Sequence, residues 1–509
     1  MIRLVLTLVA IASLASCGSA PGSDSPGIDA DLDGYEASED CNDADASVFP
    51  GVSTSCTAEC GEGTQTCQAD GSVSPCVCTP LCEATTGRCY YISQSRGSDA
   101  NPGSFTAPWA SYLNIVSYYA PDDHPATAVD LQPGDFVYFF DGTYTETYGY
   151  FNQEPALFLR QVNGADGEPI TLKAYPGQTP ILSPARTQAI NIAQSSWIDV
   201  EGFEIRDVVG GGVRVEESDH VGLSRLNIHD IRGNSASNIA GLSIQSSDDV
   251  TLDHSEIHDI IPSEDIEGDN LHVSHCVILF RGGNNRILYN TLWQGPAPDE
   301  RMRLGGVLYK HAAETPGQHF EVAYNTIRDV HYSSVSSGSP GSRIHHNLIV
   351  DSSPIRFTNF GGPTNNSDNI VSHNTILGGA LSYAPSNEYF PVGAFDFTDN
   401  IVVDSAESYG EFGVVVVSKY GSDALYSEVV TAGTLTFERN CYFNPQAPLR
   451  WDLFDASGGD YGVLGQAYDF AGWQALGFDT SSTVVDPVLD ADSRPTEEAC
   501  AERGWLAGR

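Results

Sequence analysis

The sequence predicts an all-β solenoid, a right-handed parallel β-helix. A short phrase that ends in an apolar residue recurs nine times, at spacings of 22 to 40 residues. A repeat with variable insertions is typical of a solenoid, because a coil can bulge into a loop without breaking the stack. The phrases are bounded by Gly, Asn, Asp and Ser, which are turn signals, and no helical periodicity runs through the region. The copies are FEI, LNI, SEI, NTL, NTI, NLI, NTI, NIV and NCY, and they end at residues 205, 228, 257, 292, 327, 349, 376, 402 and 442.

The last six copies begin with asparagine. Equivalent residues of successive parallel coils lie about 4.8 Å apart. A buried asparagine there can bond its own turn and the asparagines above and below, which gives an amide ladder. We therefore expect Asn347 and Asn374 to be buried with their amides bonded along the stack. The alternative is a set of unrelated Asn-rich turns. The six residues are Asn290, Asn325, Asn347, Asn374, Asn400 and Asn440.

The N-terminus has the pattern of an export signal. Arg3 precedes an apolar run over residues 4–14, which is too short to span a bilayer. Leu14-Ala-Ser-Cys17 resembles a bacterial lipobox, which implies cleavage before Cys17 and lipidation of its thiol. Residues 18–28 form a linker. We expect a lipid-anchored protein of the cell envelope, on the outer membrane or cell surface; the alternative is an ordinary signal peptide.

An acidic module follows over residues 29–55. The chain has 67 acidic and 24 basic residues and a formal net charge of −43, which argues against nucleic acid as a partner. Carboxylates at alternate positions before Gly34, with Asp40 at the twelfth position, match half of an EF-hand loop. The segment resembles the acidic metal-binding repeat of secreted bacterial proteins. We expect bound Ca²⁺; the alternative is a solvated linker. The predicted ligands are Asp29, Asp31, Asp33 and Asp40.

Cysteines are concentrated in the same part of the chain. Eight of them lie between residues 41 and 89, which predicts four disulfides and a Cys-rich module over residues 56–89. The pairing stays open, since eight cysteines allow 105 connectivities. Zinc is the alternative. We expect Cys276 to be a buried thiol, and Cys441 and Cys500 could pair to hold the C-terminal tail.

Residues 90–186 are expected to cap the solenoid and form its first coils. Trp109, Tyr112, Leu113, Val116 and Tyr119 have helical spacing, which predicts a capping helix whose aromatic stripe is core. The order GSDANPG, helix, PGD, strand, GTY resembles the N-terminal end of pectate-lyase-like β-helix proteins. The resemblance implies a β-helix over residues 187–445 and a C-terminal cap over residues 446–509.

This resemblance implies polysaccharide chemistry, although one fold hosts many activities. Lyases of this fold abstract a proton next to a uronate carboxylate, which requires a base and a group that neutralises the carboxylate. Only three residues are lysine, at 173, 310 and 419. Lys310 in GVLYKHAAE resembles the catalytic lysine strand of polysaccharide lyase family 6, the alginate lyases and chondroitinase B. Those enzymes place an arginine on the next coil, where this chain has Ser336 and Ser337.

The predicted site surrounds Lys310. Arg281 lies one coil below it in VILFRGG, and an acidic loop precedes that strand. Taken individually, each histidine here is more often a structural residue than a base or a ligand, and the acidic loop has a solvated loop as its alternative. The predicted catalytic residues are Lys310, Arg281, His311, His331 and Tyr332; the predicted substrate-binding residues are His272, His275, Arg343 and Arg356; and the predicted Ca²⁺ ligands beside them are Glu267 and Asp269.

Together these features predict a monomeric, surface-anchored lyase that cleaves an acidic polysaccharide. A non-catalytic β-helix that binds glycan or builds the envelope is the alternative from a different class. A glycoside hydrolase would need two carboxylates about 5–10 Å apart on one face, for which Glu216 with Asp248 or Asp249 is the available pair. A uronate epimerase is a further possibility that the sequence leaves open.

Overall fold

A computed structural model gives the structure of most of the chain. It describes residues 30–31, 34–36, 38–42, 44–58, 61–78, 80–117, 125–145, 156–184, 188–233, 238–263, 272–299, 301–310, 319–358, 367–384, 393–403, 413–419, 433–455 and 466–507. The chain divides into two compact units, Met1–Leu81 and Cys82–Arg509. Within the described residues, none of the helices has the length and hydropathy needed to span a bilayer.

The first unit contains a small antiparallel sheet and disulfides. Strands β1 (Ser53–Ala58), β2 (Gly61–Thr66) and β3 (Val77–Cys78) pair in that order. Bridges join Cys41 to Cys67 and Cys56 to Cys76. Cys78 is also disulfide-bonded. The second unit begins with a third bridge, between Cys82 and Cys89. These bonds confirm the prediction of a disulfide-rich segment, and covalent links replace the hydrophobic core that so short a segment lacks.

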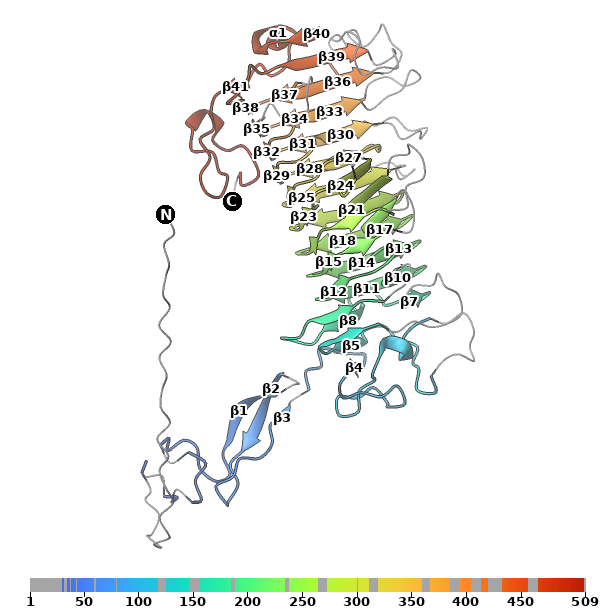
Figure 1. The fold of residues 1–509 in the computed structure, drawn as a ribbon, viewed down its shortest axis with the longest axis vertical. Coiled ribbons are helices and arrows are strands. Elements are labelled where there is room, and N and C mark those ends of the chain that lie inside the picture. Colours follow the sequence, from blue (N-terminus) through green and yellow to red (C-terminus); the bar gives the residue numbers. More distant parts are fainter. Residues whose placement is uncertain are drawn as a thin grey trace, which may run out of the picture. The chain divides into compact units, whose positions relative to one another are not determined.

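The second unit is a parallel β-helix built from three sheets, whose stacked strands are shown in Figure 1. Each sheet contains 12 strands within the described residues. Strands pair in parallel with the equivalent strand of the next coil, and only the terminal β39–β40 pair is antiparallel. We call the sheets 1, 2 and 3 in the order in which a coil passes through them.

Sheet 1 carries the longest strands of the unit. The nine-residue strands β21 and β24 lie at its centre, where the predicted site residues are found. Its strands are β7 (Leu157–Arg160), β10 (Ile190–Ala193), β13 (Val213–Glu216), β17 (Ile239–Gln245), β21 (His272–Phe280), β24 (Met302–Lys310), β27 (Val335–Ser337), β30 (Ile355–Thr358), β33 (Leu381–Ala384), β36 (Val415–Lys419), β39 (Trp451–Asp455) and β40 (Gln466–Tyr468).

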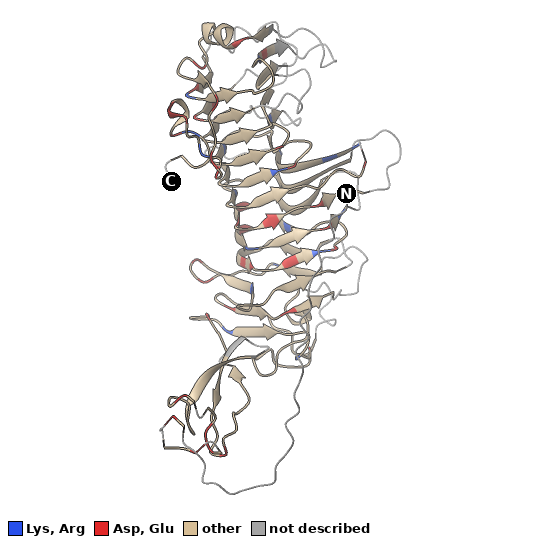
Figure 2. Cartoon of the chain, turned by 60° about the vertical axis from the view of Figure 1, so that its left-hand side comes forward, with Lys and Arg blue, Asp and Glu red and all other residues tan. Residues whose placement is uncertain are grey.

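Sheet 2 follows sheet 1 in each coil. Figure 2 shows the charged residues of the β-helix as separate patches on mostly uncharged strands. Its strands are β4 (Cys89–Ile92), β5 (Phe136–Phe139), β8 (Ile170–Ala174), β11 (Ser196–Glu201), β14 (Asp219–Ser224), β18 (Asp248–Asp253), β22 (Arg286–Leu288), β25 (Phe320–Ala323), β28 (Ser342–His345), β31 (Asn369–Ser372), β34 (Phe395–Thr398) and β37 (Leu435–Glu438).

Sheet 3 contains all nine copies of the repeated phrase, in strands β12 to β38, which confirms the repeat as the unit of the fold. Its strands are β6 (Gly142–Tyr144), β9 (Pro180–Leu182), β12 (Glu204–Arg206), β15 (Asn227–His229), β19 (Glu256–Ile257), β23 (Thr291–Trp293), β26 (Thr326–Arg328), β29 (Leu348–Val350), β32 (Thr375–Leu377), β35 (Ile401–Val403), β38 (Cys441–Phe443) and β41 (Thr483–Val484). A separate short pair joins β16 (Ile231–Arg232) to β20 (Ile260–Ile261).

The asparagine ladder is confirmed and runs without interruption from Asn290 to Asn440. Asn347 is fully buried; its backbone N–H and its side-chain amide both donate to Asn374 Oδ1, at 3.0 and 2.9 Å. The same two bonds join each asparagine to the next, as in Asn325 to Asn347. At the C-terminal end the amide of Asn440 donates to Asp479 Oδ1 at 3.0 Å. Each asparagine therefore provides hydrogen-bond partners for polar groups that would otherwise be buried without one.

The ends of the β-helix differ from the prediction in one respect. The expected capping helix is wrong for the described residues 109–117, which contain only a 3₁₀ turn, η1 (Tyr112–Asn114). Trp109 cannot join a helix because its backbone N–H donates to Tyr91 O, which pairs it with the edge of β4. Trp109 and Tyr112 are nevertheless fully buried, so their predicted core role is confirmed.

At the other end, helix α1 (Phe470–Ala475) packs Trp473 onto the last coil. The Trp473 indole N–H donates to Asp479 Oδ2 at 2.9 Å, which joins this cap to the end of the ladder. The 3₁₀ turn η4 (Glu498–Cys500) carries Cys500, whose bridge to Cys441 was predicted. Cys276 is a buried free thiol, also as predicted.

Candidate functional site on the outer face of sheet 1

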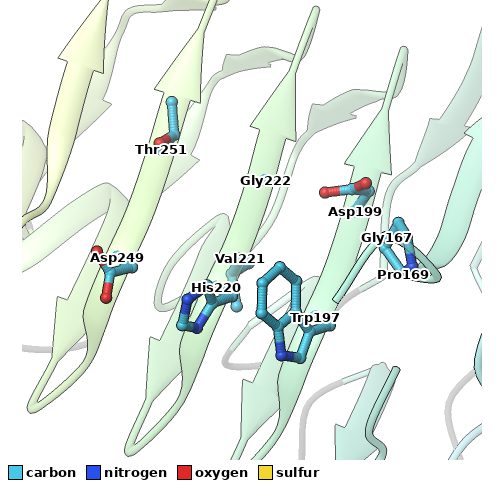
Figure 3. Close-up of a pocket in the computed structure, with 9 residues that line it drawn as sticks. All are labelled: Gly167, Pro169, Trp197, Asp199, His220, Val221, Gly222, Asp249 and Thr251. Atoms are coloured by element: carbon cyan, nitrogen blue, oxygen red, sulfur yellow. The ribbon is translucent and has the colours of Figure 1, made fainter. Parts of the chain in front are cut away.

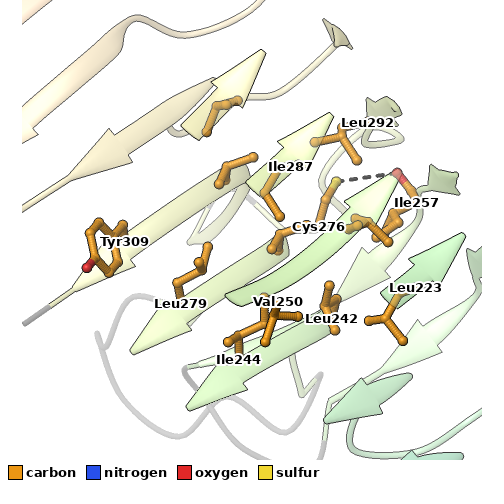
Figure 4. Close-up of a cluster of buried hydrophobic side chains, with 14 of the residues drawn as sticks. Leu223, Leu242, Ile244, Val250, Ile257, Cys276, Leu279, Ile287, Leu292 and Tyr309 are labelled. Carbon is orange, nitrogen blue, oxygen red and sulfur yellow. Dashed lines mark hydrogen bonds between the residues drawn. The ribbon is translucent and has the colours of Figure 1, made fainter. Parts of the chain in front are cut away.

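Strand alternation fixes which side chains of sheet 1 face outward. Leu279 and Tyr309 belong to the core, as Figure 4 shows. Their register partners one residue on, Phe280 and Lys310, are paired side by side and therefore face outward. The prediction that Lys310 projects from the outside of a coil follows from this register.

One break in the alternation adds a histidine to this outer face. Cys276 and Val277 are consecutive and both lie in the core. The break leaves His275 on the outer side of the sheet. Its register partner Ala240 packs against Ile278, a residue that faces outward, which supports this placement. Because the residue next to it in β24 is Gly305, the imidazole can lie over that backbone; a Cβ atom on Gly305 would overlap the ring.

Lys310 and His275 both have a lowered pKa on this face. Lys310 is half-buried, and burial lowers the pKa of its ammonium group. Its Nζ donates to Asn238 Oδ1 at 3.3 Å. Burial, with a smaller contribution from the charge of Lys310, lowers the pKa of His275 to about 3. The imidazole is therefore neutral at neutral pH, and the proton equilibrium of Lys310 is shifted toward the free amine.

Two further predicted residues complete the group from the coils above. The rings of His275 and Tyr332 meet edge to face, with centroids 5.9 Å apart. The guanidinium carbon of Arg356 lies 5.8 Å from the Tyr332 ring centroid. Arg356 is in register with Ser336 of β27, and Ser336 is in register with Leu308 of β24, two residues before Lys310. An arginine thus stands two coils above the lysine, in place of the family 6 arrangement with an arginine on the next coil.

Several polar atoms on this face are buried without a hydrogen-bond partner among the described residues. They are both ring nitrogens of His275 and the hydroxyls of Ser333 and Ser336. Ser333 lies beside β24, the coil whose Gly305 is under the His275 ring, since its carbonyl accepts from the N–H of Gly306. Buried polar groups are nearly always bonded to protein or ordered water. A concentration of unmatched atoms in one place is what a binding site shows before its ligand is added.

Arg281 and His331 border this group. The backbone N–H of Arg281 donates to Lys310 O, and its guanidinium carbon lies 5.5 Å from the Phe280 ring centroid. This places a second guanidinium next to the outward row of Lys310. His331 is exposed, and its backbone N–H donates to Leu304 O. Its side chain is therefore available at the border but is not enclosed by the group.

Two predicted substrate-binding residues lie elsewhere. Arg343 is in β28 of sheet 2 and donates to the backbone oxygen of Asp368, so the expectation that it joins Lys310 is corrected. Its strand belongs to the sheet after the site, which spacing alone did not reveal. His272 begins β21, and its Nδ1 lies 2.9 Å from Ser263 O. This contact holds His272 at the start of β21, at the opposite end of the strand from Phe280.

The remaining predicted residues lie outside the described part of the chain. They are His311, the Ca²⁺ ligands Glu267 and Asp269, the lipidation residue Cys17, and Asp29 and Asp33 of the acidic module. Among the described residues, no three His, Cys, Asp or Glu side chains gather closely enough to hold a metal ion. Sequence reasoning missed Asn238, Gly305 and Ser333, because their positions depend on the break in alternation rather than on a motif.

Comparison with known proteins supports the fold. Residues 188–376 match the family model described as "Right handed beta helix region". This region is a right-handed parallel β-helix. The match spans less than half of the chain, and a comparison with curated protein sequences found no match.

Solved structures with a similar arrangement include carbohydrate-active enzymes. A family 136 lacto-N-biosidase from Eubacterium ramulus is 12% identical with a TM-score of 0.38, over 78% of this chain and 68% of the other. A pectate lyase is 14% identical with a TM-score of 0.35, over 71% and 76%. A family 6 alginate lyase is 11% identical with a TM-score of 0.36, over 74% and 56%. These similarities concern the fold alone.

Proposed function

We propose that the outer face of sheet 1 cleaves an acidic, uronate-containing polysaccharide by β-elimination. The observation that carries the proposal is the gathering of Lys310, His275, Tyr332 and Arg356 on one face, with unmatched buried polar atoms on His275 and on Ser336, the register partner of Arg356. Arg356 and Arg281 bring positive charge to this face of a chain whose net charge is −43. This positive charge would attract a polyanion that the rest of the surface repels.

Each residue has a part in this reaction. Lys310, as the free amine, takes the proton from C5 of the uronate, and the C5–H electron pair becomes the C4=C5 double bond. The C4–O bond breaks, and the leaving oxygen takes a proton from Tyr332 or from water. Arg356 and Arg281 neutralise the carboxylate whose charge grows as the proton leaves. Neutral His275 contributes a ring N–H as a hydrogen-bond donor to the same group.

The glycoside hydrolase alternative has less support from the structure. Glu216 lies 2.6 Å from Arg214 and accepts a hydrogen bond from Asn191. Asp248 accepts from the backbone N–H of Gly283. Glu216 and Asp248 are thus engaged by neighbours. Glu216 also lies in sheet 1, whereas Asp248 and Asp249 lie in sheet 2, and a hydrolase needs its two carboxylates on one face.

The test is to incubate the purified protein with alginate, pectate and glycosaminoglycans and to follow the ultraviolet absorbance of the unsaturated product. We expect at least one polymer to give this absorbance. New reducing ends without absorbance would show hydrolysis instead. No cleavage of any of these polymers would contradict the proposal and favour a non-catalytic glycan-binding protein.

We further propose that the acidic module binds Ca²⁺. Asp40 is only 6% exposed, and one of its carboxylate oxygens has no partner among the described residues, so this oxygen could serve as a ligand to a cation. Asp31 and Asp40, together with Asp29 and Asp33, would hold the ion, which would act by stabilising this module. Glu267 and Asp269 are proposed as ligands of a second Ca²⁺ near the substrate.

We propose finally that Cys17 anchors the protein to the envelope through a lipid. The support is the lipobox-like sequence before it. Changing Cys17 to Ser should release the protein from the membrane fraction. Continued partitioning of this variant into the detergent phase would contradict lipidation.

A further inference from the structure

A pocket of about 350 Å³ lies on the outer face of sheet 2 and has no part in the proposed lyase reaction (Figure 3). This volume falls at the lower end of the range of about 300–1,000 Å³ that is typical of small-molecule sites. The pocket spans three successive coils, through strands β11, β14 and β18.

Two rows of side chains line the pocket. Asp199, Gly222 and Thr251 form the first row and are in direct register. The second row lies two residues earlier on the same strands and consists of Trp197, His220 and Asp249. Each residue of the second row has a positive φ, of 56°, 53° and 54° respectively. The same backbone turn therefore repeats on three coils and sets these side chains one beside another.

The indole of Trp197 is held in place on one side. Its ring stacks on His220 with centroids 4.0 Å apart and an angle of 20° between the planes. His220 is itself fixed by Asp219, whose Oδ2 lies 2.7 Å from Nδ1. Figure 3 shows Gly167 and Pro169 on the opposite side of Trp197, next to Asp199. A half-buried aromatic ring thus borders an opening rather than a packed core.

Gly222 lies at the centre of the pocket, and its lack of a side chain leaves room for the Asp199 carboxylate. A Cβ atom at this position would overlap the carboxylate of Asp199, which lies over the glycine backbone. Burial, and then the charges of Glu201 and Asp253, raise the pKa of Asp199. No basic side chain pairs with Asp199 or Asp249 within the described residues. Asp199 is hydrogen-bonded to the backbone of Gly222. A carboxylate has about four acceptor sites, so both aspartates keep acceptor capacity for a ligand.

We infer that this pocket binds a neutral sugar residue of a glycan and rejects uronates. An aromatic ring beside hydrogen-bond acceptors suits a pyranose, which has an apolar C–H face and hydroxyl donors. Trp197 would contact the apolar face, and Asp199 and Asp249 would accept from hydroxyls. The same carboxylates would repel a uronate, so the pocket has the opposite preference to the cationic face of sheet 1. This inference does not rest on the lyase proposal.

The experiment measures binding by titration calorimetry, with neutral oligosaccharides of glucose, xylose and galactose as probes and galacturonate oligosaccharides as the charged comparison. We expect at least one neutral probe to bind, and Trp197→Ala to weaken that binding by about tenfold or more, because the ring contact is lost. Tyr289→Ala is the matched control, since Tyr289 is 44% exposed, stacks between His254 and Tyr324, and lies outside this pocket.

Two more variants separate the contributions. Gly222→Ala should weaken neutral-sugar binding by displacing the Asp199 carboxylate while leaving the indole in place. Asp199→Asn with Asp249→Asn should remove the discrimination against galacturonate. The inference is overturned if no neutral probe binds, if Trp197→Ala and Tyr289→Ala weaken binding equally, or if the unaltered protein binds galacturonate as tightly as the neutral sugars. A response to simple cations alone would also overturn it and identify an ion site.

Discussion

At the scale of single residues, the candidate site depends on how one histidine is accommodated. His275 is 1% exposed, and its ring lies where a side chain on residue 305 would otherwise be. The neutral imidazole meets the Tyr332 ring, and the charge of the half-buried Lys310 helps to lower the pKa of His275. Removing the charge of Lys310 should therefore raise the pKa of His275.

The buried histidine predicts a pH-dependent stability. Its pKa is about 3 in the folded protein and 6.5 in its unperturbed state. At a pH between these two values, the unfolded chain therefore binds a proton that the folded chain does not bind. The stabilisation is complete above pH 6.5 and is lost as the pH falls from 6.5 toward 3. Between pH 7 and 5 the free energy of unfolding should fall about 2 kcal/mol further in the unaltered protein than in His275→Gln. Urea unfolding at the two pH values measures this, and equal losses would contradict a buried neutral imidazole.

The register of the coils was predictable from sequence, but the inner arrangement of the site was not. Aligning the repeats correctly placed Lys310 above the strand that ends before Arg281. The same alignment could not assign Arg343 to sheet 2, because turns of different lengths separate the sheets. The position of His275 depends on two consecutive core residues, Cys276 and Val277, and a simple alternating pattern assigns one of them to the surface.

At the scale of elements, the repeated phrase and the asparagine ladder are two aspects of one structure. Each phrase lies in a strand of sheet 3, and in the last six copies its first residue is the asparagine that ends the turn from sheet 2. The prediction worked because these six coils repeat the same buried turn, so the same residue type recurs. The capping helix failed because the spacing of its aromatic residues reports burial, whereas backbone pairing of Trp109 to Tyr91 decides its conformation.

The ladder predicts a large penalty for removing one rung. Asn347→Leu strands the N–H of Asn325 and the carbonyl of Val322, both of which bond the Asn347 amide. We expect the free energy of unfolding to fall by about 1–3 kcal/mol for each stranded group. Asn163→Leu is the control, since Asn163 is exposed and outside the ladder. Equal stability of the two variants in urea unfolding would contradict the contribution of the ladder.

At the scale of the whole molecule, the two units depend on different sources of stability. The β-helix buries a continuous core and closes both ends with aromatic residues, whereas the first unit depends on disulfides and, in our proposal, on Ca²⁺. Chelation should therefore affect the first unit and leave the core of the second intact. The sequence predicted this contrast from the distribution of cysteine and aspartate, because short segments without a core need other links.

Removal of Ca²⁺ tests this division. With a chelator, limited proteolysis should cut the unaltered protein within residues 29–55 several times faster, while the β-helix stays resistant. Asp40→Asn should be cut quickly with or without the chelator, because a neutral amide is a poorer Ca²⁺ ligand. Asp70→Asn is the control, since Asp70 bonds only Ser72 in its turn. Cleavage that ignores the chelator in all three proteins would contradict a structural ion in this module.

The most direct test of the account is the initial rate at which the unsaturated product forms from a cleaved polyuronate. Lys310→Ala should lower this rate by about 10²–10⁴-fold with little change in melting temperature, because the base is lost. Lys310→Arg should not restore it, since a guanidinium does not give up its proton. Lys173→Ala is the control. Lys173 lies on sheet 2 and forms an ion pair with Glu83, so its removal takes away a lysine far from the proposed site and should keep the rate within about twofold. Equal rates for Lys310→Ala and the unaltered protein would contradict the assignment of Lys310 as the base.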